Sequence, residues 1–256
     1  MRIGIVGSEG NFGLRRKKLI SQSEDDLKVI CDIALKKNKK KSESVEWNYR
    51  NLLNYDLDLV LISTPDHLKY EMIVFFLEHD ISVVVEKPLA ISVEEVDEIY
   101  RIALERNLLV HTSYNLNYFP SIKKLKDLSQ KKDFGKIKTI NLDYGHGGYK
   151  NLKENSNWRI SKNSWGGSFI DLGSHLINLT STFFEEEINI SNMNFFKILD
   201  GNLEIDTSAI LYIDDSIKIN LNTSWINYRS TFSSRIIFES GVIITENLLK
   251  YEKYGY

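Results

Sequence analysis

The chain has 256 residues, of which 42% are hydrophobic and 27% charged, so it contains enough apolar material for one large domain or two smaller ones. Its 33 basic and 35 acidic residues give a net charge of −2, which provides no positive field to hold a nucleic-acid backbone. No apolar run approaches the roughly 18 to 20 residues that a membrane span needs, and the N-terminus looks like a strand entering a turn instead of a signal peptide. We therefore expect a cytoplasmic protein that binds neither nucleic acid nor membranes.

Short apolar runs alternate with segments of helical spacing in the first 118 residues. The expected strands are residues 3–6, 27–31, 57–63, 81–85 and 108–112, and the expected helices are residues 14–21, 70–78 and 92–106. Ser92 and Glu95 fit a capping box at the start of the last helix. Strands that are apolar throughout are typical of a parallel sheet covered on both faces. We therefore predict an N-terminal Rossmann domain, a doubly wound parallel sheet, over residues 1–118.

The pattern changes beyond Pro120, where apolar and polar residues alternate with a period of two. Such alternation occupies residues 136–143, 209–213, 216–224, 234–238 and 241–245, with turn signals at Asp214-Asp215 and Ser240-Gly241. This pattern predicts a mostly antiparallel open sheet with one face toward solvent or an interface. Residues 119–256 are therefore expected to form an α+β domain that binds substrate and joins copies of the chain into a homo-oligomer. The fold class is α/β overall.

A glycine-rich turn directly follows the first expected strand and opens the first helix. Gly7, Gly10 and Gly13 are spaced as Gly-x-x-Gly-x-x-Gly, and Asn11 and Phe12 precede the last glycine. At such a turn the backbone N–H groups and the helix dipole can hold the diphosphate of a dinucleotide, and a Cβ would obstruct its approach. The more common spacing is Gly-x-Gly-x-x-Gly, so the turn alone also fits an ordinary connection between a strand and a helix.

Asp32 strengthens the dinucleotide interpretation. It ends the second expected strand, 19 residues after Gly13, near the spacing at which a carboxylate accepts hydrogen bonds from the adenosine ribose. A carboxylate at this place repels a 2′-phosphate, so the sequence favours NAD as the cofactor. The lysine-rich run at residues 36–41 is typical of a solvated loop, but it leaves NADP open.

Two further motifs indicate a family. Glu86-Lys87-Pro88 ends the strand at residues 81–85, and Asp171-Leu172-Gly173-Ser174-His175 lies in the second half of the chain. With Ser63-Thr64-Pro65-Asp66-His67, residues 114–120 and Ser224-Trp225, these motifs make most of the chain resemble the Gfo/Idh/MocA oxidoreductases. In that family a Rossmann domain precedes an α/β domain whose open sheet packs against a partner subunit. The substrates are commonly sugars, polyols or nucleotide-linked sugars.

The resemblance implies further site residues. Those that would line the cofactor cleft are Thr64, Pro65, His67, Glu86, Lys87 and Asn115. Trp158 and Arg159 would approach the substrate, where an arginine can hold a phosphate or carboxylate with two parallel hydrogen bonds. A surface Arg159 paired with an acid is an equal alternative. Relatives usually continue into a segment that ends in a helix, so the chain ending at Tyr256 resembles a C-terminally short member.

Lys87, Asp171 and His175 are the expected catalytic residues, and all three are also expected to contact the substrate. Lys87 follows the carboxyl end of a parallel strand, where it can polarise a substrate oxygen or share in its proton transfer. Asp171 and His175 are four residues apart, so a helix would project both from one face. His175 can take a hydroxyl proton while a hydride leaves the same carbon, and Asp171 can orient His175 or hold a neighbouring hydroxyl.

These residues predict an NAD(P)-dependent oxidoreductase acting on a secondary hydroxyl or ketone of a sugar or nucleotide-sugar, with a role in surface-polysaccharide biosynthesis as one setting. A non-catalytic dinucleotide-binding or scaffold protein is an alternative for a chain without the usual C-terminal segment. A short-chain dehydrogenase or epimerase would use Tyr149 and Lys153 on one helix. The glycines before Tyr149 and Asn155-Ser156-Asn157 after it are poor helix material, and this counts against that alternative.

Three remaining features carry less information. His146 stays open between a structural role and one facing the substrate. Cys31, the single cysteine, is expected to be a buried strand residue without chemistry. The histidines, carboxylates and cysteine do not show the spacing of metal ligands, so no metal site is predicted.

Overall fold

The computed structural model describes residues 1–37, 44–154, 160, 166–184, 188–227 and 230–247. The chain divides into two compact units, Met1–Ser113 and Tyr114–Tyr256, and each is described by itself. The boundary expected at residue 118 falls at the end of a short 3-10 helix, η3 (Asn115–Tyr118), in the second unit.

The first unit contains a six-stranded sheet in the order β3-β2-β1-β4-β5-β6. Its strands are β1 (Arg2–Val6), β2 (Asp26–Cys31), β3 (Val45–Glu46), β4 (Leu59–Ile62), β5 (Ser82–Glu86) and β6 (Val110–Ser113). Every neighbouring pair is parallel, and in register Val6 lies beside both Cys31 and Ile62. The carboxyl ends of these strands therefore share one edge of the sheet, and β1 and β4 lie where the strand order reverses.

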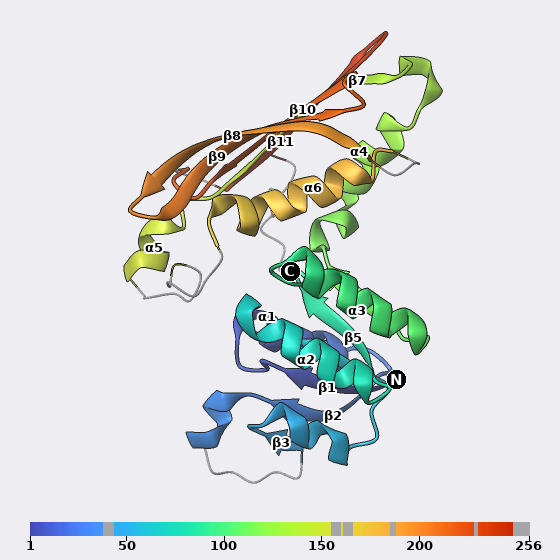
Figure 1. Ribbon diagram of the computed structural model, residues 1–256, viewed down its shortest axis with the longest axis vertical. Helices are drawn as coiled ribbons and strands as arrows, with labels where there is room; N and C mark the ends of the chain where they lie inside the picture. Colours follow the sequence, from blue (N-terminus) through green and yellow to red (C-terminus); the bar gives the residue numbers. More distant parts are fainter. Residues whose placement is uncertain (38–43, 155–159, 161–165, 185–187, 228–229, 248–256) are drawn as a thin grey trace. The chain divides into compact units, whose positions relative to one another are not determined.

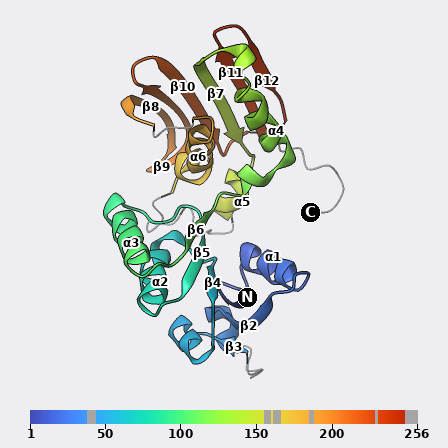
Figure 2. The same cartoon turned by 90° about the vertical axis from the view of Figure 1, so that its right-hand side faces the viewer.

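Different helices bury the two faces of this sheet (Figure 2). On one face Val60 and Ile62 pack with α2 (Asp66–Glu78) and α3 (Val93–Glu105), and on the other Ile5 packs with Ile20 of α1 (Asn11–Ile20). The expected capping of α3 is present, because Ser92 Oγ accepts the Glu95 N–H at 3.2 Å. Two 3-10 helices, η1 (Ile33–Lys37) and η2 (Tyr49–Asn54), complete the connections.

The second unit contains another six-stranded sheet, in the order β12-β11-β7-β10-β9-β8. Its strands are β7 (Ile137–Gly145), β8 (Ile190–Asp200), β9 (Leu203–Ile213), β10 (Ile217–Ser224), β11 (Thr231–Phe238) and β12 (Val242–Thr245). β7 and β10 pair in parallel and the other four pairs are antiparallel. The predicted fold class, a parallel Rossmann sheet followed by a mostly antiparallel sheet, is confirmed.

Helices cover one face of the second sheet, where α6 (Ser174–Ser181) and α4 (Pro120–Ser129) lie (Figure 1). From Glu204 to Ile213, burial alternates along β9, with Ala209 and Leu211 buried toward this face. The other face carries polar ladders, such as Asn220 donating to Asn141 at 2.7 Å. Short helices η4 (Lys132–Phe134), α5 (Tyr149–Glu154) and η6 (Phe169–Gly173, one turn of π-helix) fill the remaining connections.

The strand β8 was not expected from the sequence. It forms one edge of the sheet, and all eleven of its residues are exposed, among them Phe196 at 63% and Ile198 at 55%. Because neither face of β8 is buried, its sequence lacks the contrast between inward and outward positions that marks a strand. Among the residues that the structure describes, no helix has the length and apolar character to cross a membrane.

Candidate active site

The turn after β1 requires glycine at two of its three glycine positions. Gly7 has a φ of +78°, and a Cβ there would lie 2.6 Å from the Ser63 carbonyl oxygen. A Cβ on Gly13 would lie 2.1 Å from the Gly7 carbonyl oxygen, which is closer than a Cβ can come to another atom. Gly10 differs, since its Cβ would meet that oxygen at an ordinary 3.7 Å. Gly7 and Gly13 therefore hold a tight turn against the start of α1, whereas Gly10 only leaves the turn uncovered.

The N-terminus of α1 suits an anion. The first N–H groups of a helix, here those of Asn11, Phe12 and Gly13, have no acceptor within the helix and carry partial positive charge. No side chain caps this end and no acidic residue lies in the first turn. Glu9, just before the helix, is paired with Lys17 at 2.7 Å, and this ammonium holds the pKa of the Glu9 carboxyl below its ordinary value. A diphosphate would thus meet backbone donors and a carboxylate that Lys17 already neutralises.

Asp32 lies beside this turn, directly after β2. Its Oδ2 accepts the Glu9 N–H at 2.9 Å and its Oδ1 accepts the Ala34 N–H at 2.9 Å. The carboxylate is therefore fixed beside the glycine turn, and each of its oxygens keeps a further lone pair for a hydroxyl group. This arrangement fits the predicted contact to a ribose.

The other predicted cofactor residues of the first unit follow the neighbouring strands. Thr64 and Pro65 come after β4, with Pro65 at the N-cap position of α2, and His67 is exposed in the first turn of that helix. Ser63 Oγ, at the same strand end, is buried with no hydrogen-bond partner among the described residues. A buried hydroxyl of this kind, beside a turn that excludes side chains, fits an edge built to receive a polar ligand. The residues present therefore suit a bound dinucleotide.

An arginine whose side chain is 11% exposed, and which the sequence analysis did not single out, connects the strand ends at this edge. Arg16 of α1 donates to Glu86 Oε1 at 2.8 Å and to Ser113 Oγ at 3.0 Å, at the ends of β5 and β6. It also donates to the carbonyl oxygens of Ile62 at 3.2 Å and Val84 at 3.4 Å. Burial lowers the pKa of Arg16, and the Glu86 carboxylate opposes that effect. Glu86, predicted as a cofactor contact, is thus an ion-pair partner of Arg16 in this structure.

Lys87 follows Glu86 at the end of β5, where its backbone is held by another cation. The Lys69 side chain, in α2, is only 1% exposed and donates to the carbonyl oxygen of Lys87 at 3.0 Å. The peptide bond between Lys87 and Pro88 is cis. The segment that carries Lys87 is therefore fixed by contacts from outside its own strand.

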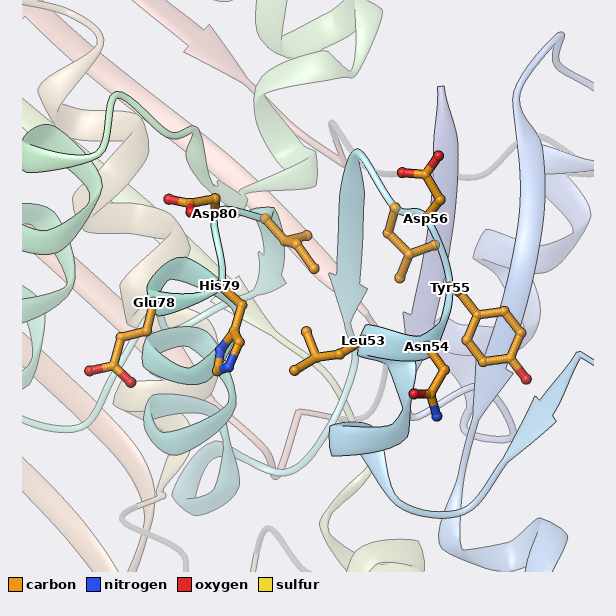
Figure 3. A pocket seen from close by; sticks show the side chains of 9 residues that line it. Leu53, Asn54, Tyr55, Asp56, Glu78, His79 and Asp80 are labelled. Carbon is orange, nitrogen blue, oxygen red and sulfur yellow. The ribbon is translucent and has the colours of Figure 1, made fainter.

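A groove of about 700 Å³ lies at the opposite edge of the first sheet (Figure 3). It is formed by the segments that precede β4 and β5, and Leu53 and His79 face each other across it. Its acidic members are largely neutralised, since Asp56 pairs with Arg2 and Asp80 with Arg106. Because open parallel sheets bind ligands at their carboxyl ends, we do not assign this groove to the cofactor.

In the second unit, Asp171 and His175 lie on one continuous helical segment. Asp171 is in η6 and His175 in the first turn of α6. Trp225, which is fully buried, donates its Nε1–H to Asp171 Oδ2 at 3.1 Å. His175 is 7% exposed and lies edge-on to the rings of Tyr114 and Tyr144, with centroids 5.8 and 6.1 Å away.

His146, whose role the sequence left open, lies beside Asp171. Its Nε2 is 3.8 Å from Asp171 Oδ2, and its Nδ1 accepts the Gly148 N–H at 3.1 Å. Since Nδ1 is an acceptor, the proton of the neutral ring is on Nε2, the nitrogen that faces the carboxylate. A substrate hydroxyl between these two groups could accept from His146 and donate to Asp171 at once.

Glu204 supports this cluster from β9, and the sequence analysis missed it. Its Oε1 accepts the Phe169 N–H at 2.6 Å and the Ser168 hydroxyl at 3.1 Å, at the start of η6. A Cβ on Gly167 would lie 2.8 Å from the Glu204 side chain, so a glycine is needed for this approach. The carboxylate thereby caps the turn that carries Asp171.

The remaining predicted site residues are placed as follows. Asn115 is exposed at the start of η3 in the second unit, and Trp158 and Arg159 lie outside the described residues. Tyr149 and Lys153 do lie on one helix, α5, so the inference that this pair would not share a helix was wrong. Both bind Asp200, at 2.5 and 2.8 Å, and the pKa of Tyr149 is raised by burial and by this carboxylate. Both side chains are thereby engaged by the Asp200 carboxylate, which counts against their use as the acid–base pair of a short-chain dehydrogenase.

Two family models cover nearly the whole chain. Residues 1–114 match the oxidoreductase family with an NAD-binding Rossmann fold, and residues 122–244 match the GFO/IDH/MocA C-terminal domain. The fold and the matches together define an oxidoreductase-family protein of the dinucleotide-binding class. The chain belongs to the Gfo/Idh/MocA family, which confirms the family and the NAD-binding Rossmann fold that its motifs predict.

Individual relatives are distant. The chain is 22% identical over 230 residues to the 2,7-anhydro-N-acetylneuraminate hydratase of Mediterraneibacter gnavus, a match covering 86% of this chain and 58% of the relative. The first two curated relatives are matched over 42% and 58% of their own length, so the chain spans about half of each.

Solved structures share the fold at low identity. The WlbA dehydrogenase from Bordetella pertussis, in complex with NADH and UDP-GlcNAcA, is 18% identical with a TM-score of 0.85, over 97% of this chain and 74% of that one. The scyllo-inositol dehydrogenase from Lactobacillus casei, with NAD(H) and scyllo-inositol bound, is 18% identical with a TM-score of 0.82, over 96% of this chain and 76% of that one.

Proposed function

We propose that the protein is an NAD-dependent oxidoreductase that moves a hydride between the nicotinamide and a secondary hydroxyl or ketone of a sugar or nucleotide-sugar. The observation that carries this proposal is the pairing, in one chain of this family, of a glycine turn suited to a diphosphate with a helical segment bearing Asp171 and His175. The proposal requires Lys87 and His175 to meet at the same substrate carbon.

The cofactor would be held at the carboxyl edge of the first unit. Gly7, Gly10, Asn11, Phe12 and Gly13 would receive the diphosphate and Asp32 the ribose, with Thr64, Pro65, His67, Glu86, Lys87 and Asn115 lining the remainder. Bound NAD supplies the hydride acceptor for oxidation of a carbinol. The carboxylate of Asp32 favours NAD over NADP, because it would repel a 2′-phosphate.

Side chains of the protein would take up the proton that leaves the substrate hydroxyl. His175, buried between two tyrosine rings, accepts it as the carbon–hydrogen bond is broken, and Lys87 polarises the same oxygen. Asp171, fixed by Trp225, holds an adjacent hydroxyl together with His146 Nε2–H. Two hydroxyl positions are thereby recognised, and this favours polyhydroxylated substrates over simple alcohols.

Sugars and nucleotide-sugars are the substrate classes proposed for this site. Solved structures of the same fold contain UDP-GlcNAcA in one case and scyllo-inositol in the other, and both compounds include a polyhydroxylated ring. A nucleotide-sugar would place the reaction in the assembly of surface polysaccharide. Trp158 and Arg159 are the proposed contacts to the more distant part of such a substrate.

The test is turnover against a panel of polyols, sugars and nucleotide-sugars, with NADH formation followed by absorbance and substrate loss by mass spectrometry. Substrate loss is measured separately because one relative is named a hydratase. We expect NADH formation with at least one compound and a decrease in kcat of about 10²- to 10⁴-fold in His175→Gln and Lys87→Ala. NADH binding should be unchanged in His175→Gln and retained, though weaker, in Lys87→Ala, because Lys87 also lines the proposed cofactor site. His79→Gln, an exposed histidine at the other edge of the first sheet, is the control. Tight NAD binding without turnover of any compound would instead indicate a scaffold.

We also propose that β8 forms a homodimer contact with a second copy of the chain. An exposed edge strand with Phe196, Ile198 and Leu199 is a template for pairing with an identical strand about a two-fold axis. Sedimentation of the wild type should give an oligomer and Phe196→Lys a smaller species. A monomeric wild type at micromolar concentration would exclude this contact.

A further inference from the structure

Lys69 occupies an unusual place in the first unit. Its side chain is 1% exposed, although an ammonium group is among the costliest groups to remove from water. Burial lowers the pKa of Lys69, and the Asp66 carboxylate at 2.7 Å opposes that effect. A chain that only needed to fill this volume would place an apolar side chain here, so the charge itself requires an explanation.

The partners of Lys69 supply that explanation. Besides Asp66, the carbonyl oxygens of three consecutive residues lie within hydrogen-bond distance of its Nζ, Glu86 at 2.8 Å, Lys87 at 3.0 Å and Pro88 at 3.0 Å, so four acceptors share its three N–H groups. In an extended strand successive carbonyl groups point to opposite sides, so three that converge on one atom belong to a backbone that has left the strand. Their partial negative charges meet at one point, and a cation there offsets them.

We infer that Lys69 is a positioning residue that sets the backbone of residues 86–88 and thereby aims the Lys87 side chain at the substrate. The inference rests on the function proposed for Lys87. The Lys69 ammonium binds the carbonyl oxygens of Lys87 and of both its neighbours, so it fixes the peptide groups on each side of the Lys87 Cα. Arg16 holds the Glu86 side chain of the same segment, so the buried Lys69 and the partly buried Arg16, from two helices, both bind it.

The inference separates Lys69 from a residue that merely stabilises the fold. A positioning residue acts through Lys87, so its removal should lower kcat and leave KM and NADH binding nearly unchanged. Displacement of a catalytic group by about 1 Å can cost roughly 100-fold in rate. A residue that only stabilises the fold would lower the melting temperature without this separation of kcat from KM.

The experiment is a double-mutant cycle with Lys69→Met and Lys87→Ala, measured by single-turnover NADH formation and by NADH titration. We expect Lys69→Met to lower the rate by about 10- to 100-fold in the wild-type background and by less than about 3-fold in the Lys87→Ala background, because groups that act as a unit are not additive. Equal losses in the two backgrounds would overturn the inference, and so would an unchanged rate in Lys69→Met.

Matched variants keep the test decisive. Lys28→Met removes a partly exposed lysine of β2 that contacts none of residues 86–88 but pairs with Asp26, and it should leave the rate unchanged. Asp66→Asn keeps all three carbonyl contacts. A decrease in rate as large as that of Lys69→Met would therefore show that the ion pair matters, and not the hydrogen bonds to the carbonyl groups of residues 86–88. If Lys69→Met does not fold, Lys69→Arg replaces it, since a planar guanidinium cannot direct donors from one atom to three carbonyl groups.

A crystal structure of the variant gives a readout without activity. The inference expects residues 86–88 to move, with the Lys87 Cα displaced from its wild-type position. An unmoved backbone would overturn it even if the protein turns over none of the sugars tested. A wild type without turnover, by contrast, bears on the proposed function alone.

Discussion

The glycine turn of the first unit and the Asp171 cluster of the second are built in different ways. The turn depends on backbone geometry, because a Cβ at Gly7 or Gly13 would collide with main-chain oxygens. The cluster depends on side chains from separate segments, where Trp225 and His146 both face one carboxylate oxygen of Asp171. A site formed by backbone groups requires glycine at the positions where a Cβ would collide, and it depends little on the identity of the other residues in the turn. A site made of side chains can be altered one group at a time.

The largest effect is therefore expected at Gly13. Gly13→Ala places a Cβ 2.1 Å from the Gly7 carbonyl oxygen, so the turn must open and NADH affinity should fall by more than about 100-fold. Gly10→Ala is the matched control, because its Cβ would lie 3.7 Å away from that oxygen. Fluorescence titration with NADH measures both variants. Equal NADH affinities of Gly13→Ala and Gly10→Ala would contradict the view that backbone geometry determines this site.

A smaller effect is expected at His146. His146→Gln keeps a polar side chain but moves the donor away from Asp171, so KM for a polyhydroxylated substrate should rise by about 3- to 10-fold, the loss of one hydrogen bond. kcat should change less, since His175 still takes the proton. Steady-state kinetics with a sugar and its monodeoxy analogue provides the check. A KM that rises equally for both compounds would argue against a bound second hydroxyl.

The smallest effect is expected at the amino edge of the first sheet. The hydrogen bond from Arg2 lowers the pKa of Asp58 from 3.8 to about 2. Its contribution to stability is therefore fully present above about pH 4 and is lost as the pH falls toward about 2. Asp58→Asn should remove that part of the acid dependence, seen in thermal midpoints, and leave NADH affinity unchanged. A change in NADH affinity would mean that the two edges of the sheet are not independent.

Sequence patterns predict these two regions to different degrees. The glycine turn and Asp32 are local signals, since their spacing along the chain decides their geometry. The partners of Asp171 are not local: His146 and Trp225 follow the parallel strands β7 and β10, where Gly145 lies beside Ser224 in register. A register between strands that are far apart in sequence leaves no trace in residue spacing, so His146 could not be assigned and Glu204 was missed.

Strand β8 and Lys69 show two further limits. Periodicity detects strands through alternating burial, and β8 has none because every residue is exposed. Lys69 appears in the sequence as the single lysine of a mostly apolar helix, and only the fold reveals that its ammonium reaches three carbonyl groups at the end of β5. Helix α5 shows the reverse case, because weak helix formers around Tyr149 did not prevent it.

Arg16 connects helix α1 to the strand ends of the first unit. The helix whose first turn would receive a diphosphate carries, less than two turns further on, a guanidinium bound to the ends of three neighbouring strands. Because these hydrogen bonds hold α1 at Arg16, the helix cannot shift along its axis without displacing Glu86, the residue next to Lys87. The first turn of α1 and the backbone next to Lys87 thus belong to one connected hydrogen-bonded unit.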